Sequence, residues 1–204
     1  RVALGADPGH SPGRRSELRA GYELGWIHYA EQIGTSSLAQ PDGRDQQLRL
    51  RGAFEGFDRP HVPRRGLRAE AQAAWYLEAP GAPRDFGQLW GRESFAVPLG
   101  PDGTLRITAE GGASVGGAVP PGYAFTLGGP GRLTAFGTEQ LRGRHLALGR
   151  LEYQLAIATL GPVGGGSVWL SVAGESGSVF EAAESARFEY CGTAGLLVDT
   201  VLGP

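Results

Sequence analysis

The sequence predicts an all-β fold, an antiparallel transmembrane β-barrel, and three observations support this prediction. Several stretches alternate apolar residues with polar or very small ones over roughly ten positions, which is the length and period of a strand that crosses a bilayer. Glycine is abundant, with 35 residues in a chain of 204, and this suits turns and crowded strands better than helices. A run of about 18 apolar residues is absent, so a transmembrane helix is excluded.

The clearest alternation lies between residues 66 and 77. One set of positions is apolar: Leu67, Ala69, Ala71, Ala73, Trp75 and Leu77. The intervening set is mostly polar: Arg68, Glu70, Gln72, Ala74 and Tyr76. Because successive side chains of a strand point to opposite faces, we expect the first set to face lipid. A register shift of one residue would place Arg68 and Glu70 in hydrocarbon.

The same alternation predicts further strands along the chain. They are expected at 17–29, 48–57, 88–99, 104–115, 124–128, 145–157, 167–175 and 188–198, after a short N-terminal stub at 1–6. Short turns such as 100–103 alternate with long connections such as 34–47 and 129–144, an asymmetry typical of outer-membrane barrels. Aromatic residues near the strand ends predict a girdle at the membrane interface. They are Trp26, Tyr29, Trp75, Tyr76, Trp90, Tyr123, Phe125, Trp169, Phe188 and Tyr190.

The faces opposite the apolar sets carry charges of both signs, which predicts a watery interior. A soluble β-sandwich that serves as a binding module would show a similar pattern, and it is kept as an alternative.

Composition excludes several classes of function. The formal charge of −2 offers no basic surface for nucleic acid. Cys191 is the single cysteine, so an intrachain disulfide and a thiolate metal site are excluded, and we expect Cys191 to be a strand residue. The four histidines show no ligand spacing, and no cofactor is expected.

A GxSxG match occurs at 112–116, with Ser114 in the position of a nucleophile. A nucleophile elbow needs a helix after the serine. Here the following residues, 116–122, include Pro120, Pro121 and several glycines, which forbid a helix. The segment 128–132 resembles a phospholipase oxyanion loop but follows the serine motif instead of preceding it. We therefore expect no catalytic residue in this chain.

Residues 125–157 read FTLGGPGRLTAFGTEQLRGRHLALGRLEYQLAI, and this segment resembles the signature loop of the bacterial surface antigen superfamily. In those barrels a strand that ends in LGG leads to a long loop that folds into the lumen, and the next strand carries an LEY-like segment. Residues 57–66 and 172–180 resemble two further motifs of the family. Residues 197–204 are similar to the segment that precedes the family's final strands.

The resemblance is greatest to the barrel that follows a patatin-like phospholipase domain. The loop is more similar to that branch's RLSGY than to the VRGF of protein insertases, because Thr134 stands where the insertase arginine would be. The resemblance implies one domain, 1–204, which is the C-terminal barrel of an outer-membrane protein. The chain opens at Arg1 and lacks methionine, so we expect a piece of a longer precursor, incomplete at both ends and without the final strands.

The resemblance also implies a function. The barrel would sit in the cell outer membrane, in contact with its lipid, and would anchor or help export an upstream patatin-like hydrolase domain of the same precursor. A barrel that inserts or translocates other proteins is the alternative. The chain itself would not be an enzyme, and a homo-oligomer is compatible with either function.

The loop 129–144 is expected to fold into the lumen and to be held there by charge. Arg132 or Arg142 would supply charge-assisted bonds to Glu152 and Glu175 on neighbouring strands. Glycines, among them Gly143, would permit the tight path, and Phe136 completes the set of residues expected to hold the loop.

Overall fold

The computed structural model describes residues 2–28, 42–60, 62–160 and 166–199. The strands are β1 Val2–Ala6, β2 Gly9–Gly13, β3 Ser16–Ile27, β4 Gly43–Glu55, β5 Gly66–Glu78, β6 Phe86–Leu99, β7 Gly103–Gly116, β8 Phe125–Leu127, β9 Leu141–Gly143, β10 His145–Leu160, β11 Gly166–Phe180 and β12 Glu189–Asp199. Two short 3₁₀ turns, η1 Pro121–Tyr123 and η2 Ala183–Ser185, complete the elements. Neither helix in this part of the chain is long and apolar enough to cross a membrane.

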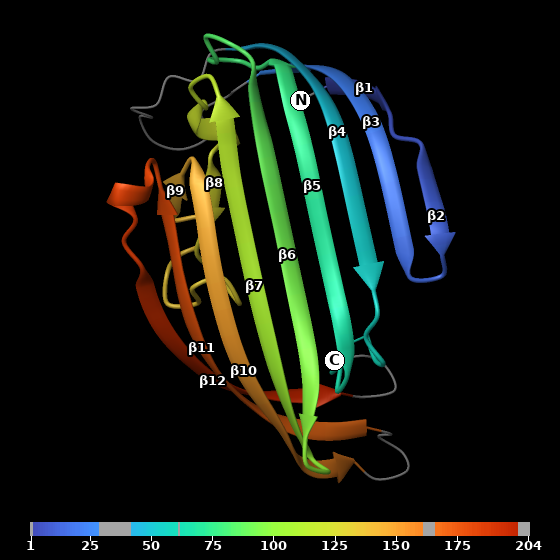
Figure 1. Ribbon diagram of the computed structural model, residues 1–204. Helices are drawn as coiled ribbons and strands as arrows, with labels where there is room; N and C mark the ends of the chain where they lie inside the picture. The colour runs from blue at the N-terminus through green and yellow to red at the C-terminus, as the bar shows by residue number, and fades with distance from the viewer. Residues whose placement is uncertain (1, 29–41, 61, 161–165, 200–204) are drawn as a thin grey trace.

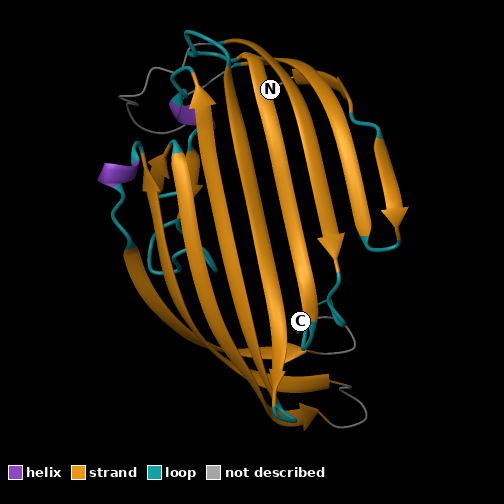
Figure 2. Cartoon of the chain, in the orientation of Figure 1, coloured by secondary structure: helices purple, strands orange, loops and turns teal. Residues whose placement is uncertain are grey.

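Ten of the described strands form one curved antiparallel sheet (Figures 1 and 2). Its order is β1-β3-β4-β5-β6-β7-β10-β11-β12, and β2 also pairs with β3. Strands β8 and β9 pair only with each other and lie against β10 and β11. A β-sandwich is therefore excluded, because the wall is a single curved sheet and not two packed sheets. The predicted all-β antiparallel barrel fold is confirmed.

The register is continuous across the middle of the sheet, and it decides which side chains share a face. Glu70 of β5 pairs with Arg92 of β6, Arg92 pairs with Glu110 of β7, and Glu110 pairs with Leu148 of β10. Paired residues of an antiparallel sheet point to the same side. We call this side, on which β8 and β9 lie, the inner face and the opposite side the outer face.

The outer face is largely apolar and exposed. On β5 it carries Leu67, Trp75 and Leu77, with 36%, 41% and 45% of their surfaces exposed. The alternation predicted for 66–77 is thus confirmed. Other exposed apolar residues of this face are Leu18, Leu24, Trp26, Leu48, Leu50, Leu89, Phe95, Ile107, Leu151, Val172 and Leu196. One acid, Glu93, interrupts this surface between Ala69 and Ala109 of the neighbouring strands.

The inner face is polar and largely buried. Glu110, Glu152 and Glu175 are each no more than 5% exposed, and all three accept hydrogen bonds from other side chains. A charged group can be buried at acceptable cost only when it is paired and hydrogen-bonded. This face therefore carries a connected polar network.

Some strand predictions were wrong. The strand expected at 124–128 is present as β8, but it pairs with β9 on the inner face and not with a strand of the wall. The expected stub at 1–6 contains β1, and β2 and β9 were not predicted. Strand β4 begins at Gly43, five residues before the expected start, because polar residues there face inward. Tyr29, most of the connection 34–47, His61 and the closing residues 200–204 lie outside the described residues.

The aromatic girdle was also only partly correct. Trp26 and Trp75 are exposed on the outer face, but Trp90 and Trp169 point inward, and Trp169 is only 4% exposed. Trp90 directly follows outward-facing Leu89, so it lies on the inner face of β6. Trp169 directly precedes outward-facing Leu170, so it lies on the inner face of β11. A hydrogen-bonding ring such as indole is compatible with a polar interior.

The connection between β4 and β5, residues 56–65, folds under the inner face. Val62 and Pro63 are buried there. The backbone N–H groups of Arg64 and Arg65 donate to Asp58 Oδ1 at 2.9 and 3.1 Å and hold the turn. Although burial opposes ionisation, these hydrogen bonds lower the pKa of Asp58 below its usual value. This turn is the segment 57–66 singled out in the sequence.

Arginine at Ala71 should destabilise the barrel much more than arginine at Gln72. Ala71 is on the outer face and Gln72 on the inner face of the same strand, so only the first change places a charge in hydrocarbon. The expected cost for Ala71→Arg is about 2 to 4 kcal/mol near the midplane. Urea titration of the complete protein in lipid vesicles measures the difference, and equal stability of the two variants would contradict a spanning β5.

Candidate functional site

The long connection between β7 and β10, residues 117–144, lies on the inner face, and we call it the inner loop. It contains η1 and then the β8–β9 hairpin, in which Phe125 pairs with Gly143 and Leu127 with Leu141. The hairpin tip turns back sharply at Gly128, where φ is +121° and a Cβ atom would lie 2.1 Å from the carbonyl oxygen of Gly137. Only glycine fits this position.

Apolar packing attaches the inner loop to the wall. Leu127 and Leu133 of the loop are fully buried against Leu146 and Leu148 of β10, and Phe136 packs on the same cluster. This is the hydrophobic core cluster of the described residues, and the β8–β9 hairpin that supplies Leu127 lies inside the curve of the sheet (Figure 1). The loop is thus packed as a part of the folded interior.

Two wall glycines make room for the β8 side chains. A Cβ atom at Gly112 of β7 would lie 2.8 Å from the ring of Phe125, and one at Gly177 of β11 would lie 3.1 Å from Leu127 Cδ1. Since real Cβ atoms almost never approach so closely, the hairpin depends on bare backbone at Gly112. Glycines at inward-facing positions of β7 and β11 were the sequence signal that could have predicted this close approach of the hairpin.

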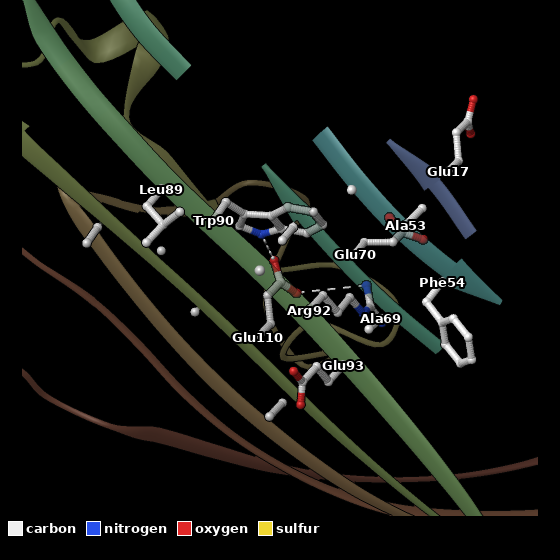
Figure 3. Close-up of a pocket in the computed structure, with 17 residues that line it drawn as sticks. Glu17, Ala53, Phe54, Ala69, Glu70, Leu89, Trp90, Arg92, Glu93 and Glu110 are labelled. Carbon is white, nitrogen blue, oxygen red and sulfur yellow. Dashed lines mark hydrogen bonds and ion pairs between the residues drawn. The ribbon is translucent and has the colours of Figure 1, made fainter. Parts of the chain in front are cut away.

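Arg132 forms the strongest charged contact between the inner loop and the wall. Its Nε and Nη2 atoms donate to Glu110 at 3.2 and 2.7 Å, and Nη2 also donates to the carbonyl oxygen of Thr126 at 3.0 Å. Trp90 Nε1 donates to the same carboxylate at 2.9 Å. Figure 3 shows Glu110 between Trp90 and Arg92, whose Nη1 lies 3.8 Å away. A bidentate guanidinium–carboxylate pair with this little exposure fixes both position and orientation.

Thr134 forms the second contact, with Glu175 of β11. Its backbone N–H donates to Glu175 Oε2 at 2.6 Å and its hydroxyl donates to Oε1 at 3.1 Å. Cys191 of β12 donates to Oε2 at 3.1 Å, so the predicted strand position of Cys191 is confirmed. Arg150 of β10 also bonds to Glu175.

Glu152 of β10 belongs to the wall network and does not touch the inner loop. It accepts hydrogen bonds from Arg106, Arg150, Gln154 and Ser171. Through Arg150 it is joined to Glu175 and thus indirectly to Thr134. The network connects β7, β10 and β11 across the inner face.

The expected partners of the loop arginines were wrong in detail. Arg132 binds Glu110 and not Glu152 or Glu175, because the loop path places its guanidinium over β7. Among the described residues Arg142 pairs only with Glu139 of the same loop, at 3.7 Å, and both side chains are about half exposed. Glu175 does hold the loop, but through Thr134. Whether these contacts hold the loop in the working protein stays a prediction.

Two other predicted residues have packing positions. Phe136 is in the apolar cluster described above. Gly143 lies against β11, where a Cβ atom would be 2.8 Å from the backbone nitrogen of Phe180. Glu110 and Thr134 were the residues missing from the sequence prediction. Glu110 shares its inner-face parity with several other acids, so its role had no separate signal.

Ser114 has no nucleophile elbow around it. It lies inside strand β7, is 3% exposed and accepts a hydrogen bond from Gln88 Nε2 at 3.1 Å. The residues that follow form a bend and then η1, and no α-helix starts there. Within the described ranges, no three His, Cys, Asp or Glu side chains are placed to hold a metal ion.

A comparison of folds relates this architecture to a known barrel. The chain is similar to BamA from Haemophilus ducreyi lacking POTRA domains 1–3, with a TM-score of 0.77 and 13% identity. The match covers 99% of this chain and 48% of that one, so the chain spans about half the length of that structure. No protein-family model and no curated protein sequence matches the chain. The described sheet thus shares its fold with part of that structure.

Loss of the Arg132 side chain should free the inner loop, whereas loss of Arg142 should not. Arg132→Ala removes two hydrogen bonds to buried Glu110, each worth about 1.5 to 3 kcal/mol. Arg142→Ala removes only an exposed pair, worth at most about 1 kcal/mol. Trypsin cleavage after Arg144 in the complete protein measures access to the loop. Equal protection of both variants and the parent would show that the Arg132 contact does not hold the loop.

Proposed function

We propose that this chain is the membrane-embedded barrel of an outer-membrane protein, and that it anchors or helps export an upstream domain of the same polypeptide. The apolar outer face and the polar inner face of one curved sheet carry this proposal. In a bilayer such a sheet presents side chains to lipid while its charged network stays in the interior. Outer-membrane lipid is then its immediate partner.

The inner loop favours an anchoring role over that of an open pore. Its apolar cluster and its contacts with Glu110 and Glu175 fill the interior next to β7, β10 and β11. A filled interior suits a barrel whose task is to hold or pass on an attached domain. By the resemblance of residues 125–157, that domain would be a patatin-like lipid hydrolase.

A barrel that inserts or translocates other proteins is the second candidate. The likeness of fold to BamA favours it. Thr134 favours the first candidate, since the resemblance places the insertase arginine at this position. Here that position bonds to Glu175 through its backbone N–H and its hydroxyl, a contact for which no guanidinium is needed.

Membrane location is tested by fractionating cells that express the complete protein. We expect it in the outer-membrane fraction, resistant to carbonate extraction, with a faster electrophoretic mobility before heating than after. An Ala71→Arg/Ala73→Arg variant should lose this heat-sensitive mobility, because both residues are on the outer face of β5. A parent protein recovered in the soluble fraction would rule out the proposed function.

The serine of the GxSxG match should have no part in any hydrolysis by the complete protein. Ser114→Ala should leave ester and phospholipid hydrolysis unchanged within error, because Ser114 is buried in β7 without a following helix. Hydrolysis that disappears in this variant would contradict the assignment. Hydrolysis by the complete protein that survives it would place the activity in the upstream domain and support the first candidate over the second.

A further inference from the structure

A polar cavity of about 470 Å³ lies on the inner face, between the tip of the inner loop and the connection that joins β4 to β5. Gly131 borders it from the loop, and Phe57, Pro60 and Pro63 border it from the connection. Its walls come from β5, β6, β7 and β10. The cavity adjoins the Arg132 contact, because Trp90 and Arg92 line it and both face Glu110. Nothing in the proposed function uses the cavity.

Guanidinium groups dominate the cavity. Its charged lining residues are Arg68, Glu70, Arg92, Arg106 and Arg150. Glu70 accepts two hydrogen bonds from Arg68, at 3.1 and 2.8 Å, so the one acid of the lining is already paired. Other carboxylates lie behind these arginines, at Glu55, Glu110, Glu152 and Glu175.

The carboxylates behind the three inner arginines have little capacity left to accept hydrogen bonds. A carboxylate has about four lone-pair sites. Glu152 accepts from four groups, and Glu175 accepts from four. Glu110 accepts three bonds, from Trp90 and Arg132. The acceptors of the network are therefore nearly saturated by other donors.

The donors of the cavity are not saturated. Arg92 makes no hydrogen bond within the described part of the chain, since its closest carboxylate oxygen is 3.8 Å away. Nη1 of Arg106 makes no hydrogen bond there either, since this guanidinium donates to Glu152 through Nη2. The hydroxyls of Ser94 and Thr108 bond to each other at 2.9 Å, which leaves one hydroxyl hydrogen for another acceptor. The cavity thus lacks acceptors, and an oxyanion would supply them.

We propose that this cavity binds a soluble oxyanion, a phosphate group, with Arg92 and Arg106 as its principal donors. Phosphate suits the site because its several oxygens can accept from two guanidinium groups and a hydroxyl at once. The cavity opens on the inner face and not toward the apolar outer face, so the ligand is a soluble molecule and not a lipid headgroup. The proposal depends on the barrel fold and not on the proposed function.

Titration of the complete, detergent-solubilised protein with inorganic phosphate at constant ionic strength tests the proposal. Calorimetry should show saturable binding, and the fluorescence of Trp90, which lines the cavity, should change with the same midpoint. Arg92→Gln should raise the phosphate concentration at half-saturation by at least about tenfold, because a charge-assisted donor is lost. This variant should fold, since it loses only a 3.8 Å ion pair and Glu110 keeps its hydrogen bonds from Trp90 and Arg132.

Three further variants complete the experiment. Arg44→Gln is the matched control, because Arg44 pairs with Glu78 outside the cavity, and it should bind as the parent does. Trp90→Phe should lose the fluorescence change but keep the calorimetric binding. Arg92→Lys retains the charge without the planar pair of donors and should bind with intermediate affinity, which decides the question even if Arg92→Gln does not fold. Absence of saturable binding by the parent, or equal affinity in the parent and both Arg92 variants, would overturn the proposal.

Discussion

Every part of this structure depends on the in-register antiparallel ladder that runs from β3 to β12. The ladder satisfies the backbone hydrogen bonds of adjacent strands, and its two-residue period assigns each side chain to one face. Because the register holds from β5 to β10, Glu70, Arg92 and Glu110 lie side by side on the inner face. A slip of one residue in any of these strands would move charged groups to the outer face and leave their partners unpaired.

The inner loop adds an interior that resembles the core of a soluble protein. Its leucines pack on β10, and two of its polar contacts reach acids on different strands, Glu110 on β7 and Glu175 on β11. Each acid is also bonded to wall residues, so the loop and the wall order each other. Removal of one loop residue would leave a buried carboxylate short of donors, which is more costly than the loss of one exposed bond.

The strands of the wall could be predicted because alternation is a local property. The turn at Gly128 and Gly129 was also visible in sequence as a pair of adjacent glycines, and both have positive φ in the structure. The partner of Arg132 could not be predicted, because it depends on a loop path that includes Leu133 and Glu139 in the left-handed region, where non-glycine residues are uncommon. The alternation places Glu110, Glu152 and Glu175 all on the inner face, so it does not single out Glu110 as the partner of Arg132.

The inward position of Trp90 was within reach of the sequence. It shares its parity with Gln88 and Arg92, while Leu89 and Phe95 mark the outer face. The girdle was predicted from the position of each ring along its strand. The face of the strand to which the ring points was not included. The alternation along β6 also places Glu93 on the outer face. Its charge does not fit the apolar surface around it.

The burial of Leu127 and Leu133 also determines how the inner loop can move. Each leucine that leaves such a site loses roughly 1.5 to 3 kcal/mol of burial. Departure of Leu127 would also uncover the bare backbone at Gly177. Withdrawal of the loop is therefore a local unfolding event and not a small hinge motion, and it belongs to the slow range of microseconds to seconds. Amide protons of β8 should consequently exchange with solvent as slowly as those of the wall strands.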